Sequence, residues 1–326
     1  MAKKLPTSVY RTLFVDAWRL TIERKALWVF GLFAAVLSTG GVCEMAAKGF
    51  RNLVVIRDVY LDILRGTFTG AEVFGQLVKH VTAFDPNRLT GAATLVIFIG
   101  IVIIIASIVS QGALIAGCGP KPISDRNAYL HGNHTFWHLL PLNVLHKFIH
   151  ALLTLIAAVP LLLLIQTGGA TGIFVSLITF LIILPLTIIV ATLFILASIH
   201  SVRTGDHTFD SIHHAVNLFR SHALATFETG AILFAAVLAA IVGFLATIMI
   251  FSLPFAVLAT VALVSKSVFF FTVLNILGVI ALFFLLAVFA GATTTFQYAV
   301  WVRFYEHAVA PRKKIISKLH RIWIGK

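Results

Sequence analysis

The stretch DHTFDSIHHAVNLFRSHALATFE, residues 206–228, decides the fold. It predicts a short, polar, His-rich helix that runs directly into a long apolar segment. Weaker copies, HTFWHLLPLNVLHKFIH at 134–150 and DAWRLTIERKAL at 16–27, also precede apolar runs. The pattern predicts three repeats of one unit, in which a surface helix is followed by a membrane hairpin.

Short identities align the three copies. The match of Asn143 with Asn217 needs a one-residue gap, so the repeat depends mainly on the shared order of polar and apolar segments. The matched positions are HTF at 134–136 with HTF at 207–209, Asn143 with Asn217, and KAL at 25–27 with HAL at 222–224.

The composition excludes a soluble globular protein. Of 326 residues, 60% are hydrophobic and only 11% are charged, whereas soluble domains carry about 25% charged residues. Most apolar runs exceed the roughly 20 residues of a membrane-spanning helix, while β-barrel strands need only about 9–11 alternating residues. We therefore expect an all-α, polytopic membrane protein, with residues 1–326 forming a single membrane domain.

About six transmembrane helices in three hairpins account for the apolar runs. The sequence SLPF at 252–255 is expected to divide the run after residue 223, because about 63 Å of helix is too long for one crossing. An interfacial or partly re-entrant piece would then extend to Lys266. The expected spans are 26–42, 92–116, 144–165, 173–199, 224–251 and 268–298.

Polar segments separate these spans. Residues 1–25 are expected to form a basic amphipathic helix with Val9, Leu13, Ala17 and Leu20 on one stripe. The other segments are two amphipathic extracytoplasmic helices within 43–90, cytoplasmic surface segments at 118–142 and 200–223, and a basic cytoplasmic tail at 303–326.

Lys and Arg set the expected orientation. With six spans both termini share one side, which carries 18 of the 25 Lys and Arg residues, and the positive-inside rule places that side in the cytoplasm. Because these charges flank apolar spans, the net charge of +13 indicates contact with anionic phospholipid and not with nucleic acid. The residues expected at the lipid surface are Arg11, Arg19, Arg24, Lys25, Arg312, Lys313, Lys314, Lys318 and Arg321.

Histidine is the one unusual residue type. Of the 13 histidines, 12 fall on the expected cytoplasmic side. His131, His134 and His138 recur at helical spacing, and Asp210 and His214 are four residues apart, so each set shares a helix face that could bind Zn²⁺ or another transition metal. The alternatives are a simple place in the headgroup zone and pH-dependent lipid contact.

No motif identifies an enzyme. The sequence has no Walker motif, nucleophile elbow, HExxH or Gly-rich phosphate loop. Proton or ion coupling is disfavoured, because no ionisable residue lies near the centre of an expected span. GALIAG at 112–117 contains two overlapping small-xxx-small pairs, which favour close helix crossing. We expect no cofactor.

Two further stretches carry a resemblance. ERKALWVFGL at 23–32 and FQYAVWVRFY at 296–305, together with the surface helices before the third and fifth spans, resemble bacterial six-span membrane proteins of unknown function. Those proteins are similar to the membrane domain attached to some glycerophosphodiester phosphodiesterases. The resemblance implies a multi-pass protein of the cytoplasmic (inner) membrane and a lipid-related setting, with no activity and no site residues.

Three functions remain open. The first is a non-enzymatic membrane protein that acts in envelope or lipid homeostasis, or as a membrane subunit of a larger assembly with a protein partner or further copies of itself. The second is a transporter or lipid-translocating protein whose Pro-containing spans line a path. The third is a metal-dependent membrane enzyme that uses the cytoplasmic histidines.

Overall fold

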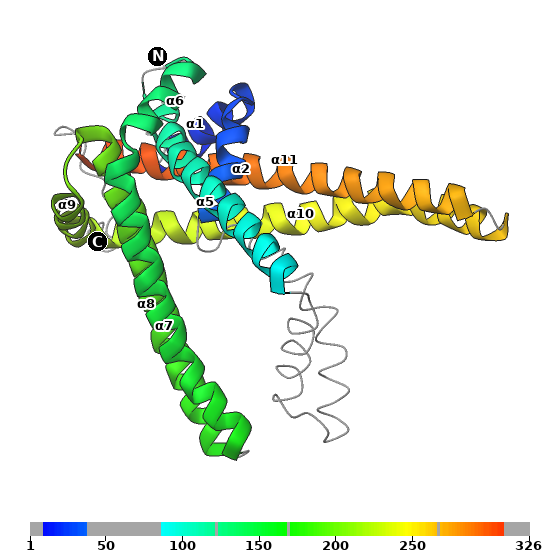
Figure 1. The fold of residues 1–326 in the computed structure, drawn as a ribbon. Coiled ribbons are helices and arrows are strands. Elements are labelled where there is room, and N and C mark those ends of the chain that lie inside the picture. Colours follow the sequence, from blue (N-terminus) through cyan, green and yellow to red (C-terminus); the bar gives the residue numbers. More distant parts are fainter. Residues whose placement is uncertain (1–8, 38–85, 121–122, 168–169, 266–267, 310–326) are drawn as a thin grey trace, which may run out of the picture.

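The computed structural model describes residues 9–37, 86–120, 123–167, 170–265 and 268–309. Within these ranges the chain forms α-helices and no strand, which confirms the all-α prediction (Figure 1). Most of the expected extracytoplasmic segment 43–90 and residues 310–326 of the expected tail lie outside the described residues. The helices are α1 (Val9–Glu23), α2 (Leu27–Leu37), α5 (Pro86–Gly117), α6 (Asp125–His134), α7 (Phe136–Thr167), α8 (Ala170–Thr204), α9 (Thr208–Ser221), α10 (Ala223–Val264) and α11 (Val268–Val309).

The helices form a packed head from which two long hairpins extend (Figure 1). The hairpins are α7–α8 and α10–α11, and they leave the head in different directions. We call their described parts within 151–189 and 234–289 the arms. The head comprises α1, α2, α6 and α9, the end of α5 from residue 106, and the remaining ends of the four arm helices. Eight of the nine described helices contribute side chains to the core of the head. The exception is α6, which packs against α5.

A close helix crossing joins α2 to α11 inside the head. A Cβ atom on Gly31 would lie 2.3 Å from the Gly291 carbonyl oxygen, and one on Gly291 would lie 2.4 Å from the Trp28 carbonyl oxygen. The Thr295 hydroxyl lies 3.1 Å from the Leu27 carbonyl oxygen and donates to it across the same interface. Only glycine allows the two backbones to approach this closely.

The small residues of α5 also make close crossings. A Cβ on Gly112 would meet Gly132 and Thr135 at less than 3 Å, and one on Gly117 would lie 2.8 Å from the Leu27 side chain. Gly132 in turn allows α6 to lie against the backbone of α5. A Cβ atom on Gly132 would lie 2.3 Å from the Val109 carbonyl oxygen. The close packing predicted from GALIAG is therefore confirmed, with α6 and α2 as the partners.

Five of the described helices are long and apolar enough to cross a membrane. They are consistent with a multi-pass membrane protein, as expected. Of the first expected span, 26–42, only α2 lies within the described residues. The five stretches are Ile97–Gly117, Phe136–Ala157, Leu177–Thr204, Ala223–Ala262 and Ile276–Val309.

The surface helix expected at 134–150 does not form as a separate element. It is the tip of α6 followed by the first half of α7, which begins at Phe136 and runs continuously through the stretch expected as the third span, about 144–165. Thr135 marks the break, where its hydroxyl donates to the carbonyl oxygens of the last turn of α6. One face of residues 136–150 packs inside the head, where Leu139, Leu142 and Asn143 are buried.

The HTF identity does not align equivalent positions. His134 ends α6, whereas His207 immediately precedes the first residue of α9. Asn143 is buried, while its match Asn217 is exposed. The order of a short helix followed by a longer one recurs twice among the described helices, as α6–α7 and α9–α10, whereas α1 has 15 residues and α2 has 11. A threefold repeat of hairpins stays a prediction.

The expected division of the fifth span at SLPF is also wrong. α10 is one continuous helix of 42 residues, with Pro254 inside it. Pro254 lacks the backbone N–H that would donate to the Ile250 carbonyl oxygen, yet the helix continues past it. Membrane helices tolerate proline where neighbouring groups and local adjustments satisfy the freed backbone groups. α11 has the same length, so the second arm is longer than the first.

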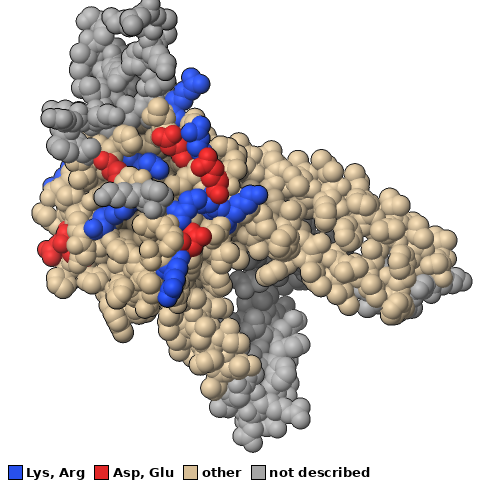
Figure 2. All heavy atoms as spheres, turned by 90° about the horizontal axis from the view of Figure 1, so that it is seen from above, with Lys and Arg blue, Asp and Glu red and all other residues tan. Residues whose placement is uncertain are grey.

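Most charged residues in the described part of the chain lie in the head; Arg88, near the start of α5, lies outside it. Figure 2 shows the Lys, Arg, Asp and Glu side chains gathered over the head, while the arm formed by α10 and α11 shows none. The sequence contains no such residue in 151–202, 229–265 or 267–302. The head thus carries the polar segments, and the arms present apolar surface.

Candidate functional site: a wedge cavity between the hairpins

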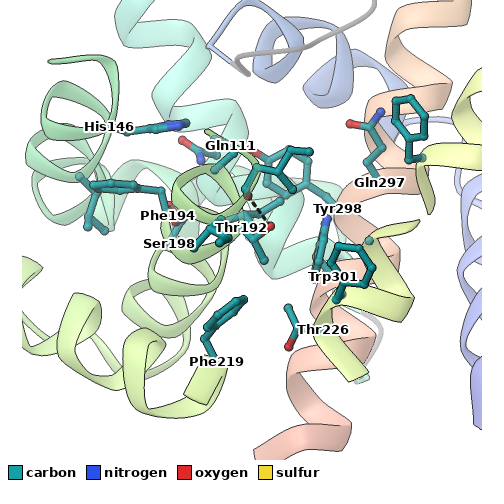
Figure 3. A pocket seen from close by; sticks show the side chains of 18 of the residues that line it. Gln111, His146, Thr192, Phe194, Ser198, Phe219, Thr226, Gln297, Tyr298 and Trp301 are labelled. Atoms are coloured by element: carbon teal, nitrogen blue, oxygen red, sulfur yellow. Dashed lines mark hydrogen bonds between the residues drawn. The ribbon is translucent and has the colours of Figure 1, made fainter. Parts of the chain in front are cut away.

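A cavity of about 460 Å³ lies where the two hairpins leave the head. Figure 3 shows its lining side chains converging from both hairpins and from α5 and α9. This volume lies within the roughly 300–1,000 Å³ of ligand pockets. We call it the wedge cavity; its polar and aromatic lining residues include Gln111, Asn143, His146, Thr192, Phe194, Ser198, Phe219, Thr226, Phe227, Phe234, Gln297, Tyr298 and Trp301.

The inner end of the wedge cavity is polar and buried. Gln111 from α5, Asn143 from α7 and Tyr298 from α11 are 5%, 9% and 5% exposed. The Asn143 amide donates to the Gln111 side-chain oxygen at 2.7 Å and to the Leu139 carbonyl oxygen at 2.9 Å. The Tyr298 hydroxyl hydrogen-bonds the Gln111 side chain. These bonds fix three helices around one uncharged polar cluster.

The outer end of the wedge cavity is apolar and open. Phe227 and Phe234 on α10 are 68% and 70% exposed, and Ile188 on α8 is half-exposed. These side chains continue into the exposed apolar surfaces of both arms, which face lipid in a membrane. The cavity therefore changes from polar to apolar along its length, as an amphipathic ligand does.

The hydroxyl groups in the walls of the wedge cavity already donate their hydrogens within the protein. Thr192, Ser198 and Thr226 each donate to a backbone carbonyl four residues earlier in their own helix, at 2.8, 2.8 and 2.9 Å. Their oxygens can still accept hydrogen bonds. The His146 ring stacks on Phe194 with ring centroids 4.9 Å apart, which holds the imidazole flat against the wall.

The histidines and the aspartate predicted to bind metal do not form one site. His131 uses its Nε2 atom on the Val202 carbonyl oxygen at 3.0 Å, and His134 and Asp210 are exposed. The His138 ring lies 6.0 Å from that of His207, and the His214 ring stacks at 3.9 Å on that of His200. Among the described residues no three His, Cys, Asp or Glu side chains converge on a point where a metal ion would sit.

Sequence reasoning missed a polar chain at the end of α8. The His200 ring bonds the Tyr305 hydroxyl through Nδ1 at 2.6 Å and Asp206 through Nε2 at 2.9 Å. A side-chain hydrogen bond from Thr204 lowers the pKa of Asp206, and the His200 contact lowers it further. The residues lie on three separate segments, so only the tertiary fold brings them together, and their role in the head is structural.

The residues predicted to contact lipid divide into three groups. Arg11, Arg19 and Lys25 are exposed in or just after α1, as lipid contact requires. Arg24 is instead built into the head, where it donates to the carbonyl oxygens of Gly117 at 2.9 Å and Ile123 at 2.7 Å and pairs with Asp125 at 2.7 Å. The other five, Arg312, Lys313, Lys314, Lys318 and Arg321, lie outside the described residues.

The α1 helix has a protein partner for its apolar face. Leu13 and Ala17, two of the four residues in its expected stripe, are buried in the core of the head. Phe14 and Trp18 pack their rings against Phe296 of α11, with ring centroids 6.2 and 5.8 Å apart. α1 is therefore packed against the protein as well as being amphipathic.

Comparison with protein-family models, with curated proteins and with solved structures finds no match for this chain. The resemblance to six-span bacterial proteins stays a prediction, and the site must be interpreted from its own geometry.

Proposed function

We propose that this chain is a non-enzymatic, multi-pass membrane protein that binds one amphipathic lipid in the wedge cavity and acts in lipid or envelope homeostasis. The head would hold the polar end of the lipid, and the tails would lie between the arms. The observation that carries this proposal is the change along one cavity from buried, hydrogen-bonded polar groups to exposed aromatic and aliphatic side chains.

The depth of the wedge cavity supports this assignment. Its polar end is built from residues near the head ends of the long helices, such as Asn143 in α7 and Thr226 in α10. Its apolar end opens toward the uncharged arms. A bilayer has the same order, with headgroups at the interface and acyl chains inside. A lipid could therefore enter sideways from one leaflet without turning over.

The proposal includes six spans with both termini on the cytoplasmic side of a bacterial inner membrane. The gathering of α1, α6, α9 and the charged ends of α8 and α11 in one head supports it. Those segments are the ones that positive-inside counting assigns to a single side. Glycosylation or cysteine-accessibility mapping of the segment 43–90 tests the orientation.

Holding a lipid is better supported than carrying one across the membrane. Translocation of a charged headgroup needs ionisable groups at membrane depth, and the arms have no Lys, Arg, Asp, Glu or His in 151–189 or 234–265. We therefore expect proteoliposomes that contain the protein to scramble fluorescent phospholipid no faster than empty liposomes.

Native mass spectrometry of the protein in mild detergent tests the proposed function. We expect the wild type to retain one lipid. Gly230→Phe would fill the wedge cavity, because a Cβ at Gly230 would meet only the Trp301 ring, at 3.8 and 3.9 Å. We expect this variant to lose lipid by about tenfold, a loss of about 1.4 kcal/mol in binding.

Gly243→Phe is the matched control. Gly243 lies in the same helix, and nothing lies within 4 Å of its Cβ position. This variant should retain lipid like the wild type, and both variants should melt near the wild-type temperature. Equal lipid retention by the two folded variants would contradict the proposal.

A further inference from the structure

We infer that the lipid held in the wedge cavity is a neutral lipid with an uncharged, hydroxyl-bearing head, of the diacylglycerol type. This inference rests on the proposed function and specifies its ligand. Two features of the cavity carry it: the absence of charged side chains in its lining and the presence of acceptor oxygens whose own hydrogens are already bonded.

The first feature is the lack of charge. Among the described residues that line the wedge cavity, none is Lys, Arg, Asp or Glu. A phosphate group placed at the buried end would lose its water and gain no cation, which is among the most costly arrangements in a protein. A head without charge avoids that cost.

The second feature is the direction of the hydrogen bonds. Both hydrogens of the Asn143 amide go to protein oxygens, so only its carbonyl oxygen remains for a ligand. Thr192, Ser198 and Thr226 have likewise donated to their own helices and offer acceptor oxygens. A phosphate has only acceptors and could not donate to these oxygens, whereas a hydroxyl group supplies a donor for them.

The wall also contains donors suited to an ester. Trp301 carries an indole N–H, which is donor only, and Gln297 carries an amide NH₂ group. Figure 3 shows both on α11, on the side of the wedge cavity away from His146. A diacylglycerol head combines one donating hydroxyl with two accepting ester carbonyls, so it complements both sets.

The charged groups of the head are placed elsewhere. A second hollow, of about 260 Å³, is lined by Arg19, Arg24 and Arg303 together with Asp16 and Glu23. It lies between α1 and the ends of α5 and α11, and it shares no lining residue with the wedge cavity. Anionic headgroups can contact this charged hollow and the exposed cations of α1. The uncharged wedge cavity therefore suits a different class of lipid.

Photo-crosslinking in phosphatidylcholine nanodiscs tests the inference. The discs contain equal fractions of either diacylglycerol or phosphatidylglycerol, each with the same diazirine-bearing chains, and labelled peptides are mapped by mass spectrometry. We expect diacylglycerol to label the cavity peptides of α8 and α10 about fivefold more than phosphatidylglycerol does, a difference of about 1 kcal/mol. Gly230→Phe should remove this labelling, and Gly243→Phe should keep it.

The outcomes separate the two proposals. Labelling by phosphatidylglycerol that equals or exceeds labelling by diacylglycerol, and that Gly230→Phe removes, overturns the neutral head and leaves lipid binding intact. If neither lipid labels the cavity peptides, or if Gly230→Phe leaves their labelling unchanged, the proposed function itself is overturned. Gln297→Arg adds a cation to the wall and should shift the labelling ratio toward phosphatidylglycerol; an unchanged ratio contradicts the charge argument.

Discussion

The head and the arms are built from the same long helices but are stabilised in different ways. The largest fully buried side chains, among them Leu114, Leu196 and Phe304, all lie in the head. In the arms, side chains such as Met249 and Ile250 are 71% and 70% exposed. The head is held by protein packing, whereas the arms rely on lipid to cover their surfaces, because lipid tails are as apolar as the side chains they touch.

This difference predicts that equal substitutions have unequal effects in the two regions. Gly291→Leu should have the largest effect, because its side chain would collide with the backbone of α2 at Trp28. Overpacking costs about 1–3 kcal/mol where side chains can adjust, and more where backbone is in the way. We expect most of the folded protein to be lost, measured as the monodisperse peak in size-exclusion chromatography. Gly243→Leu in the arm should behave as the wild type, and equal loss in both variants would remove the contrast between the regions.

Thiol labelling sharpens the same contrast within the head. Burial raises the pKa of Cys118 to about 12, although the nearby Arg24 and Arg303 oppose the shift. From an ordinary value of 9.0, that rise lowers the thiolate fraction by about 1,000-fold at neutral pH. In a Cys43→Ser background, we expect maleimide to label the native protein at least that much more slowly than the protein unfolded in detergent. Rapid labelling of the native state would mean that the head is loosely packed.

Arg24 gives a prediction of intermediate size. Its guanidinium group joins the end of α1 to the loop between α5 and α6 through two backbone carbonyls and Asp125. Arg24→Gln should destabilise the head by about 2–3 kcal/mol, since charged hydrogen bonds are lost and buried carbonyls are left unpaired. Arg24→Lys keeps the charge but cannot reproduce the fork of donors, so it should rescue little. Thermal unfolding in detergent measures both, and full rescue by lysine would show that charge alone matters.

Asp206 should have the smallest effect, and its sign depends on pH. Its pKa in the folded protein is below the ordinary 3.8, first because of the hydrogen bond from Thr204 and then because of His200. The carboxylate therefore stabilises the head above the unfolded pKa, and this contribution is lost as pH falls through the lower folded value. Asp206→Asn should slightly lower the melting temperature at pH 7, and the difference from the wild type should shrink in acid. A difference that grows in acid would contradict this assignment.

Composition, hydropathy and the spacing of small residues were enough to predict the helical class and the close packing around Gly112. They failed where a residue's environment depends on its neighbours in space. The stretch 136–150 has the composition of a surface helix, yet one of its faces packs in the head, with Leu139, Leu142 and Asn143 buried. The proline at 254 was interpreted as a break, but α10 continues through it.

The wedge cavity was not predictable for a related reason. Phe227 and Phe234 line it, yet in sequence they are indistinguishable from lipid-facing residues of the same helix. Asn143 entered the sequence argument only as a repeat match, and its pairing with Gln111 depends on how α5 crosses α7. Helix crossings are set by tertiary packing, and no local pattern in one helix specifies its partner.

The glycine crossing between α2 and α11 can form only late in biosynthesis. Gly31 and Gly291 are 260 positions apart, the difference between 291 and 31. At roughly 5–20 residues per second, the ribosome needs roughly 13–52 s to make the intervening chain. During that time α2 lacks its α11 partner, so the crossing of α2 with α11 can form only after the later segment has been made.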